Sequence, residues 1–161
     1  MRDTQQLLIA CHFGALSKNE IDQFIDSVVK GDEEYDPMIF DAYSPDVGTD
    51  RRKLELFLRK SLPGFEIESD EGVFACRREL KHQIEHLGRN ECHQEEFCEF
   101  FKRLENELVI NLNIPIDFFG ELYNACDCLD ENWNFLPSEY LEEESMRVLA
   151  FINQTEHGAP S

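Results

Sequence analysis

The apolar residues of this chain recur at α-helical spacing, and this periodicity constrains the fold more than any other feature. The clearest segment has apolar side chains at i, i+3, i+4, i+7 and i+8, which places them on one face of a helix. Its apolar residues are Ile21, Phe24, Ile25, Val28 and Val29. Ser17 and Glu20 have the spacing of a capping box, and Gly31 follows as a C-terminal cap. We therefore predict a helix that starts after Ser17 and ends near Gly31.

The same spacing, interrupted by Gly, Pro and capping residues, continues along the chain. It predicts an all-α fold of about eight helices, arranged in antiparallel hairpins within one compact domain. The expected helices cover residues 7–14, 18–31, 37–43, 50–62, 70–88, 91–112, 116–130 and 137–153. Residues 65–68 alternate over only four positions, which indicates an extended link or one short strand. The buried side of the 116–130 helix is expected to carry Ile116, Phe119, Leu122, Tyr123 and Cys126.

The length and the apolar content fit one domain. A chain of 161 residues with 42% hydrophobic residues and thirteen Phe can fill one core. We predict a single domain over residues 1–153 and a flexible C-terminal tail over residues 154–161. The sequence has neither a run of eighteen apolar residues nor a positively charged leader before a hydrophobic stretch. We therefore expect a cytoplasmic protein.

The net charge limits the kinds of partner. The chain carries 34 acidic residues against 15 Lys and Arg, a formal charge of −19. Nucleic acid and anionic membranes would be repelled, so a charged partner should be basic. The acids are also clustered, because eleven of them and no Lys or Arg lie between Arg103 and Arg147. The alternative interpretation is that an acidic surface only keeps a soluble protein dispersed.

Within this acidic part of the chain, an aromatic side chain stands among carboxylates. Trp133 is the only tryptophan, and acidic residues precede and follow it. An aromatic anchor surrounded by carboxylates suits binding to a basic protein surface. The expected partner-binding residues are Asp127, Asp130, Glu131, Trp133, Glu142 and Glu143, with Asp32, Glu33 and Glu34 as a second patch. In the structural alternatives, Trp133 fills the gap between the last two helices, and residues 142–144 complement the dipole of a helix N-terminus.

Six cysteines could form three disulfides, but we expect reduced thiols because no signal peptide is recognisable. Four of them lie at or beside apolar helix positions, where Cys behaves as a small hydrophobic residue. The six are Cys11, Cys76, Cys92, Cys98, Cys126 and Cys128.

A metal-dependent enzyme is the alternative that the sequence leaves open. Residues of the types that bind zinc follow one another within one stretch, although the chain has neither a CxxC pair nor HExxH. They are His82, His86, Cys92, His93 and Cys98. A calcium loop starting at Asp130 fails, because Phe135 and Leu141 occupy the positions that require Gly and Glu. Since no catalytic motif is recognisable, we predict a protein that is not an enzyme, with no cofactor and no metal.

Residues 9–42 give the chain a family resemblance, in which the turn Gly14-Ala15-Leu16-Ser17-Lys18-Asn19-Glu20-Ile21 is followed by an amphipathic helix, a short acidic link and another helix. This segment resembles the helix-turn-helix start of small acidic bacterial immunity proteins, of the contact-dependent growth inhibition or polymorphic-toxin type. The match covers about the first quarter of the chain. The resemblance implies an inhibitor that binds a basic cognate toxin domain, often a nuclease, and occludes its active-site surface. A general acidic interaction module stays open as a further alternative.

Overall fold

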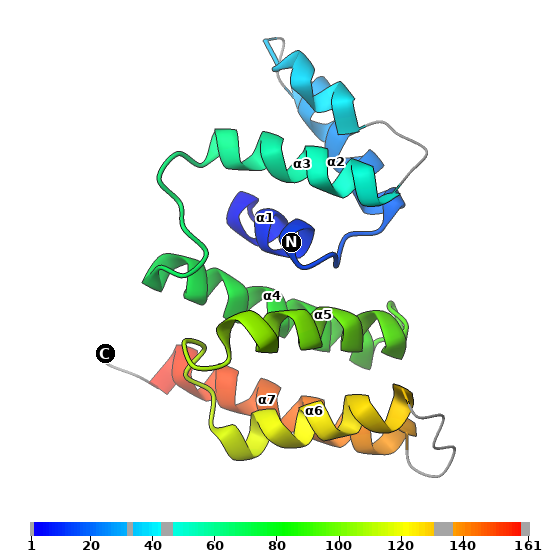
Figure 1. The fold of residues 1–161 in the computed structure, drawn as a ribbon, viewed down its shortest axis with the longest axis vertical. Coiled ribbons are helices and arrows are strands. Elements are labelled where there is room, and N and C mark those ends of the chain that lie inside the picture. The colour runs from blue at the N-terminus through cyan, green and yellow to red at the C-terminus, as the bar shows by residue number, and fades with distance from the viewer. Residues whose placement is uncertain (1, 32–33, 43–46, 131–136, 159–161) are drawn as a thin grey trace. The chain divides into compact units, whose positions relative to one another are not determined.

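The computed structural model describes residues 2–31, 34–42, 47–130 and 137–158, and in these residues the fold is all-α (Figure 1). The described part contains seven α-helices, one 3₁₀ helix and no strand, which confirms the predicted fold class. The elements are α1 (Thr4–His12), α2 (Lys18–Gly31), η1 (Pro37–Ala42), α3 (Val47–Ser61), α4 (Asp70–Gly88), α5 (Gln94–Leu108), α6 (Ile116–Asp130) and α7 (Pro137–Gly158). The helix expected at 37–43 is thus a 3₁₀ helix, and no strand forms at residues 65–68.

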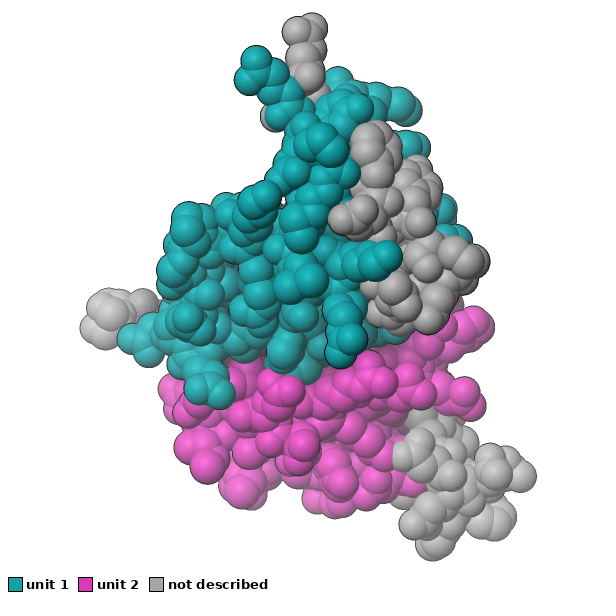
Figure 2. Space-filling view, turned by 45° about the horizontal axis from the view of Figure 1, so that its top comes forward, with its two compact units in different colours: residues 1–75 teal, residues 76–161 magenta. Residues whose placement is uncertain are grey.

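The chain divides into two compact units, residues 1–75 and residues 76–161 (Figure 2). The division falls within α4. The single domain expected over residues 1–153 stays a prediction. Helix α7 runs through Gly158, so the boundary expected at Gln154 lies inside a helix, and residues 159–161 lie outside the described part. None of the described helices is both long and apolar enough to cross a bilayer.

In the first unit, α1 and α3 pack against each other, and the capping box before α2 forms as predicted. The Ser17 N–H donates to Glu20 Oε2 at 2.8 Å, and the Glu20 N–H donates to Ser17 Oγ at 3.2 Å. Arg2 Nη1 also lies 2.8 Å from Glu20 Oε1. Burial alone would raise the pKa of Glu20, but the Ser17 N–H and the Arg2 guanidinium outweigh it and lower that pKa. The apolar core of this unit includes Leu8, Ile9, Ile21, Ile25, Ile39, Leu54 and Leu58.

The link before α4 passes close over the first turn of that helix. Ser69 Oγ caps the helix by accepting from the Gly72 N–H at 3.1 Å. A Cβ atom at Gly72 would lie 2.2 Å from the carbonyl oxygens of both Glu66 and Ile67. Only glycine therefore allows this approach of backbone to backbone.

In the second unit, aromatic side chains of α5 and α6 form much of the core, and a disulfide joins the two helices. Phe97 and Phe101 are fully buried, and Phe101 lies 4.9 Å from Phe119 between ring centroids. Cys98 and Cys126 are bonded, with Cα atoms 5.4 Å apart. The expectation that all six thiols are reduced is therefore wrong for this pair. Both residues do occupy apolar helix positions, but these positions face each other within bonding distance.

The predicted inward side of α6 is correct in part. Phe119, Leu122 and Cys126 are buried, whereas Ile116 is 79% exposed and Tyr123 is 36% exposed. Ile116 is the first residue of the helix, and the ring contacts of α6 with α5 and α7 are made by Phe119 and Phe118, one turn further along. The periodicity in the sequence therefore extends one turn beyond the packed face.

Candidate interaction surface

The outer face of α7 carries acidic side chains at helical spacing. Glu139, Glu142, Glu143 and Met146 follow one another at i, i+3, i+4 and i+7, so they share one face of the helix. All four are exposed, and Met146 is 55% exposed. No hydrogen bond or ion pair joins the carboxylates of Glu139, Glu142 and Glu143 to another described residue. We call these four residues the α7 outer stripe.

The packing of the opposite face of α7 explains why the stripe points outward. Leu141, Val148 and Ile152 are fully buried. Helix α6 is the neighbour with which α7 makes its most extensive contact, and the two helices lie side by side in Figure 1. The Tyr140 hydroxyl donates to the carboxylate of Glu121, which fixes the start of α7 on α6. The core therefore sets the rotation of α7 about its axis.

Glu144 differs from its neighbours because it belongs to the packing of the unit. Its side chain is 7% exposed, and its Oε2 atom lies 3.2 Å from Arg147 Nη1. The Arg147 guanidinium in turn lies 5.0 Å from the centroid of the Phe118 ring. The run of three glutamates at 142–144 thus separates into two exposed residues and one that is buried and paired.

The helix dipole does not account for Glu142 and Glu143. Because α7 begins at Pro137, Glu139 is the acidic residue of its first turn, and Glu142 and Glu143 lie in the second. Stabilisation of anions by the dipole falls off within the first turn. Like charges three and four residues apart in fact destabilise a helix by roughly 0.2–0.5 kcal/mol per pair. We therefore expect Glu142 and Glu143 to lower the stability of the free protein.

Asp127, the first of the predicted binding residues, lies on α6 and faces α5. Its Oδ1 atom is 3.0 Å from Lys102 Nζ, and Lys102 lies 5.8 Å from the centroid of the Tyr123 ring. Burial raises the pKa of Glu105 on α5, and the charge of Asp127 raises it further. Asp127 is thus engaged in the contact between α5 and α6, apart from the α7 outer stripe.

The remaining predicted residues are described only in part. Glu142 and Glu143 are exposed and share one face with Glu139, which the sequence analysis did not include. Glu34 is exposed. Asp130 ends α6, but its side chain is not described. Four further predicted residues lie outside the described residues, namely Asp32, Glu33, Glu131 and Trp133.

The residues proposed as zinc ligands do not form a cluster in the described part of the chain. The rings of His82 and His86 are 4.1 Å apart between centroids, and His86 Nε2 lies 3.4 Å from Glu91 Oε2. Cys98 is bonded to Cys126 and offers no thiolate. Among the described residues, no group of three or more His, Cys, Asp and Glu side chains converges as metal ligands would.

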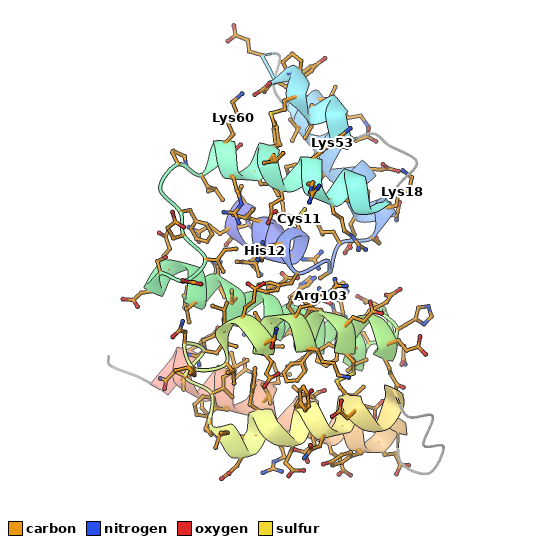
Figure 3. The ribbon with its side chains drawn as sticks, viewed as in Figure 1. Cys11, His12, Lys18, Lys53, Lys60 and Arg103 are labelled. Atoms are coloured by element: carbon orange, nitrogen blue, oxygen red, sulfur yellow. A yellow bond between two sulfur atoms is a disulfide. The ribbon has the colours of Figure 1, made fainter. Side chains whose placement is uncertain are left out.

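One histidine–carboxylate pair, which the sequence analysis did not identify, lies in the first unit near a cysteine (Figure 3). His12 Nδ1 donates to Glu55 Oε1 at 2.6 Å, and Arg59 Nη2 lies 3.5 Å from the same oxygen. The Cys11 thiol instead donates to the carbonyl oxygen of Arg51 at 2.8 Å. Burial, with the charge of Glu55 adding to it, raises the pKa of Cys11 to about 12. A thiol held protonated in this way is not an activated nucleophile. The His12–Glu55 pair therefore serves the packing of α1 on α3 and does not activate Cys11.

Basic residues are concentrated on α3, which the sequence analysis also did not identify. Arg51 to Lys53, followed by Arg59 and Lys60, supply five of the 15 basic residues of the chain. Leu54, Phe57 and Leu58 form the buried side of the helix. Four residues lie on the opposite side, which we call the α3 outer face. They are Arg52, Leu56 and Lys60, which are exposed, and Lys53, which is half-buried.

The fold and these surfaces define an all-α protein with an outward-facing acidic helix on one compact unit and a basic helix on the other. Comparison with known protein families, with curated proteins and with solved structures finds no match to this chain. The function is therefore argued from the described surfaces.

Proposed function

We propose that this protein is a binding protein for a basic partner and that the α7 outer stripe is its contact surface. The observation that carries the proposal is the exposure of Glu139, Glu142 and Glu143 on one helix face, without partners in the described part of the chain. The fold gains nothing from Glu142 and Glu143, because they lie beyond the first turn of α7 and are repelled by Glu139. A cationic partner would turn that repulsion into attraction.

Met146 gives the stripe an apolar end. Its side chain is unbranched and polarizable, so it adapts to the surface of a partner. It is 55% exposed one turn beyond Glu142 and Glu143. Contact through Met146 would bury apolar surface, while the carboxylates would orient the partner and raise the association rate.

The specific form of the proposal is an immunity protein that neutralises a cognate toxin domain, often a nuclease. Nucleases that grip phosphate groups present basic surfaces, and an acidic protein is steered towards such surfaces. Neutralisation would follow from occlusion of the basic active-site surface, with no chemistry performed by this chain. The resemblance at residues 14–21 and the charge of −19 support this form.

Calorimetric titration against the C-terminal domain encoded immediately upstream, which the immunity form predicts to be the toxin domain, tests the proposal. We expect one-to-one binding whose affinity falls as salt rises, and survival of cells that express both proteins. A general acidic interaction module would instead bind unrelated basic proteins, such as lysozyme, about as tightly as the toxin domain. Absence of binding to the toxin domain at low and at physiological salt would refute the immunity form.

A further inference from the structure

The α3 outer face is a basic surface on a strongly acidic protein. Arg52 and Lys60 lie eight residues apart and are exposed, and Leu56, halfway between them, is 53% exposed. In Figure 3, Lys53 and Lys60 are labelled along the same helix. The face thus combines cationic side chains with one half-exposed apolar side chain, and it belongs wholly to the first unit.

Only part of this positive charge is neutralised within the unit. Lys60 Nζ lies 2.8 Å from Asp36 Oδ2, although the Lys60 side chain is 64% exposed. Arg52, which is exposed, and Lys53, which is half-buried, make no hydrogen bond or ion pair with another described residue. Within the described part of the chain, these two cations at one end of the face therefore have no acidic partner.

The chain itself carries a surface that complements this face. At 1.5 Å per residue, the α3 outer face extends about 12 Å from Arg52 to Lys60, and the α7 outer stripe extends about 10 Å from Glu139 to Met146. Each has charged side chains of one sign, and each has one apolar side chain exposed by about half, Leu56 at 53% and Met146 at 55%. We propose that the α3 outer face is a docking surface for a second copy of this chain, which binds through its α7 outer stripe.

The strength and the salt dependence of this association follow from the charges. A contact between two single helix faces is smaller than the roughly 800 Å² per partner of a standard interface, so the association is weak. Each copy has a formal charge of −19, so the copies repel each other at long range. At about 0.15 M salt the Debye length is about 8 Å, which screens distant charges more than adjacent ion pairs. Association should therefore be strongest near physiological salt and weaker at both lower and higher salt.

The proposal goes beyond the proposed function and adds regulation to it. The contact is heterologous, so its repetition joins copies head to tail and covers the α7 outer stripe of each bound copy. A basic partner would then compete with the second copy for the stripe. Partner binding without self-association would refute the docking of a second copy and leave the proposed function standing. Self-association without partner binding would refute the proposed function and leave the docking proposal standing.

Sedimentation velocity of the full chain at rising protein concentration tests the proposal. We expect the weight-average sedimentation coefficient to rise with concentration, and most steeply at about 0.15 M salt. Arg52→Glu with Lys53→Glu should abolish the rise, and so should Glu142→Lys with Glu143→Lys. Glu95→Lys with Glu96→Lys, an exposed pair on α5, is the matched control for the second variant and should preserve the rise.

A mixture of the two non-associating variants gives the decisive result. The Arg52→Glu with Lys53→Glu variant keeps the wild-type α7 outer stripe, and the Glu142→Lys with Glu143→Lys variant keeps the wild-type α3 outer face. The native contact can therefore form between the two variants, and their reversed surfaces also complement each other, so we expect association to return in the mixture only. Misfolded variants would not recover in this way. A sedimentation coefficient of the wild-type chain that is independent of concentration at every salt, or no recovery in the mixture, would overturn the proposal.

Discussion

Replacing Glu142 and Glu143 with glutamine should stabilise the free protein. Each carboxylate lies one turn from Glu139, at i+3 and i+4, and none of the three is paired within the described residues. Relief of two like-charge pairs at roughly 0.2–0.5 kcal/mol each gives about 0.4–1 kcal/mol. For a chain of this size that corresponds to a rise in Tm of about 1–4 °C. Arg147 does not offset this gain, because its guanidinium is held by Glu144 and lies over Phe118.

The matched control is the same double substitution at Glu95 and Glu96 on α5. These two residues are also exposed and adjacent, but they lie in the first turn of their helix. There the carboxylates complement the helix dipole, and each contributes roughly 0.3–1 kcal/mol. Exposed Glu99 repels both of them, at i+4 and i+3, by roughly 0.2–0.5 kcal/mol per pair, which is less than the contribution of the dipole. Neutralising them should therefore lower Tm, while the same change in net charge at positions 142 and 143 should raise it.

Urea denaturation and thermal melts at low salt would measure both variants against the wild-type chain. Raising the salt to about 1 M should reduce both differences, because the Debye length falls to about 3 Å. A loss of stability in Glu142→Gln with Glu143→Gln would contradict the reasoning. It would mean that these carboxylates support the fold, and the main argument for a partner at the α7 outer stripe would fail.

Three further predictions concern the stability of the fold. Gly72→Ala should destabilise the protein because its Cβ would lie 2.2 Å from two carbonyl oxygens. Gly120→Ala is the control: its Cβ would have nothing within 4 Å, so it should stabilise α6 by up to about 1 kcal/mol. An unchanged urea midpoint for Gly72→Ala would contradict the close backbone approach. Reduction of Cys98–Cys126, which are 28 residues apart, should lower the free energy of unfolding by about 3.6 kcal/mol. Equal urea midpoints with and without reductant, or six alkylated thiols in the unreduced protein, would contradict this disulfide. The hydrogen bond from His12 lowers the pKa of Glu55 despite its burial, so the stability it confers is present above the usual Glu pKa and is lost as the pH falls through the lowered value. His12→Gln should therefore reduce the loss of unfolding free energy as the pH falls through the acidic range. An unchanged pH dependence would show that the His12–Glu55 pair does not contribute to it.

Local features were predictable because they depend on neighbours in the sequence. The capping box of Ser17 and Glu20 needs only residues three apart, and both of its hydrogen bonds form. The start of α7 at Pro137 was also predicted, but the assignment of residues 142–144 to the helix N-terminus was wrong, because these residues lie beyond the first turn. The helical class follows in the same way from apolar spacing, since each amphipathic segment must bury one face.

Features that depend on distant contacts were not predictable. The Cys98–Cys126 bond and the His12–Glu55 hydrogen bond join residues 28 and 43 positions apart, which only the packing of helices brings together. Ile116 matches the apolar period but lies beyond the packed length of α6. The α7 outer stripe was predictable only in part. The helical spacing of Glu139 to Met146 can be read from the sequence, whereas the burial of Glu144 depends on the rotation of α7 against its neighbours.

The most direct test of the central claim is a calorimetric comparison of two charge reversals against the C-terminal domain encoded immediately upstream, the proposed toxin domain. Glu142→Lys with Glu143→Lys changes the α7 outer stripe, and Glu95→Lys with Glu96→Lys makes the same change in net charge on α5. If the stripe is the contact surface, the first variant loses at least tenfold in affinity, and the second keeps most of the wild-type affinity. Equal losses in both variants would show that net charge alone governs binding, and an unchanged affinity in the first would remove the α7 outer stripe from the interface.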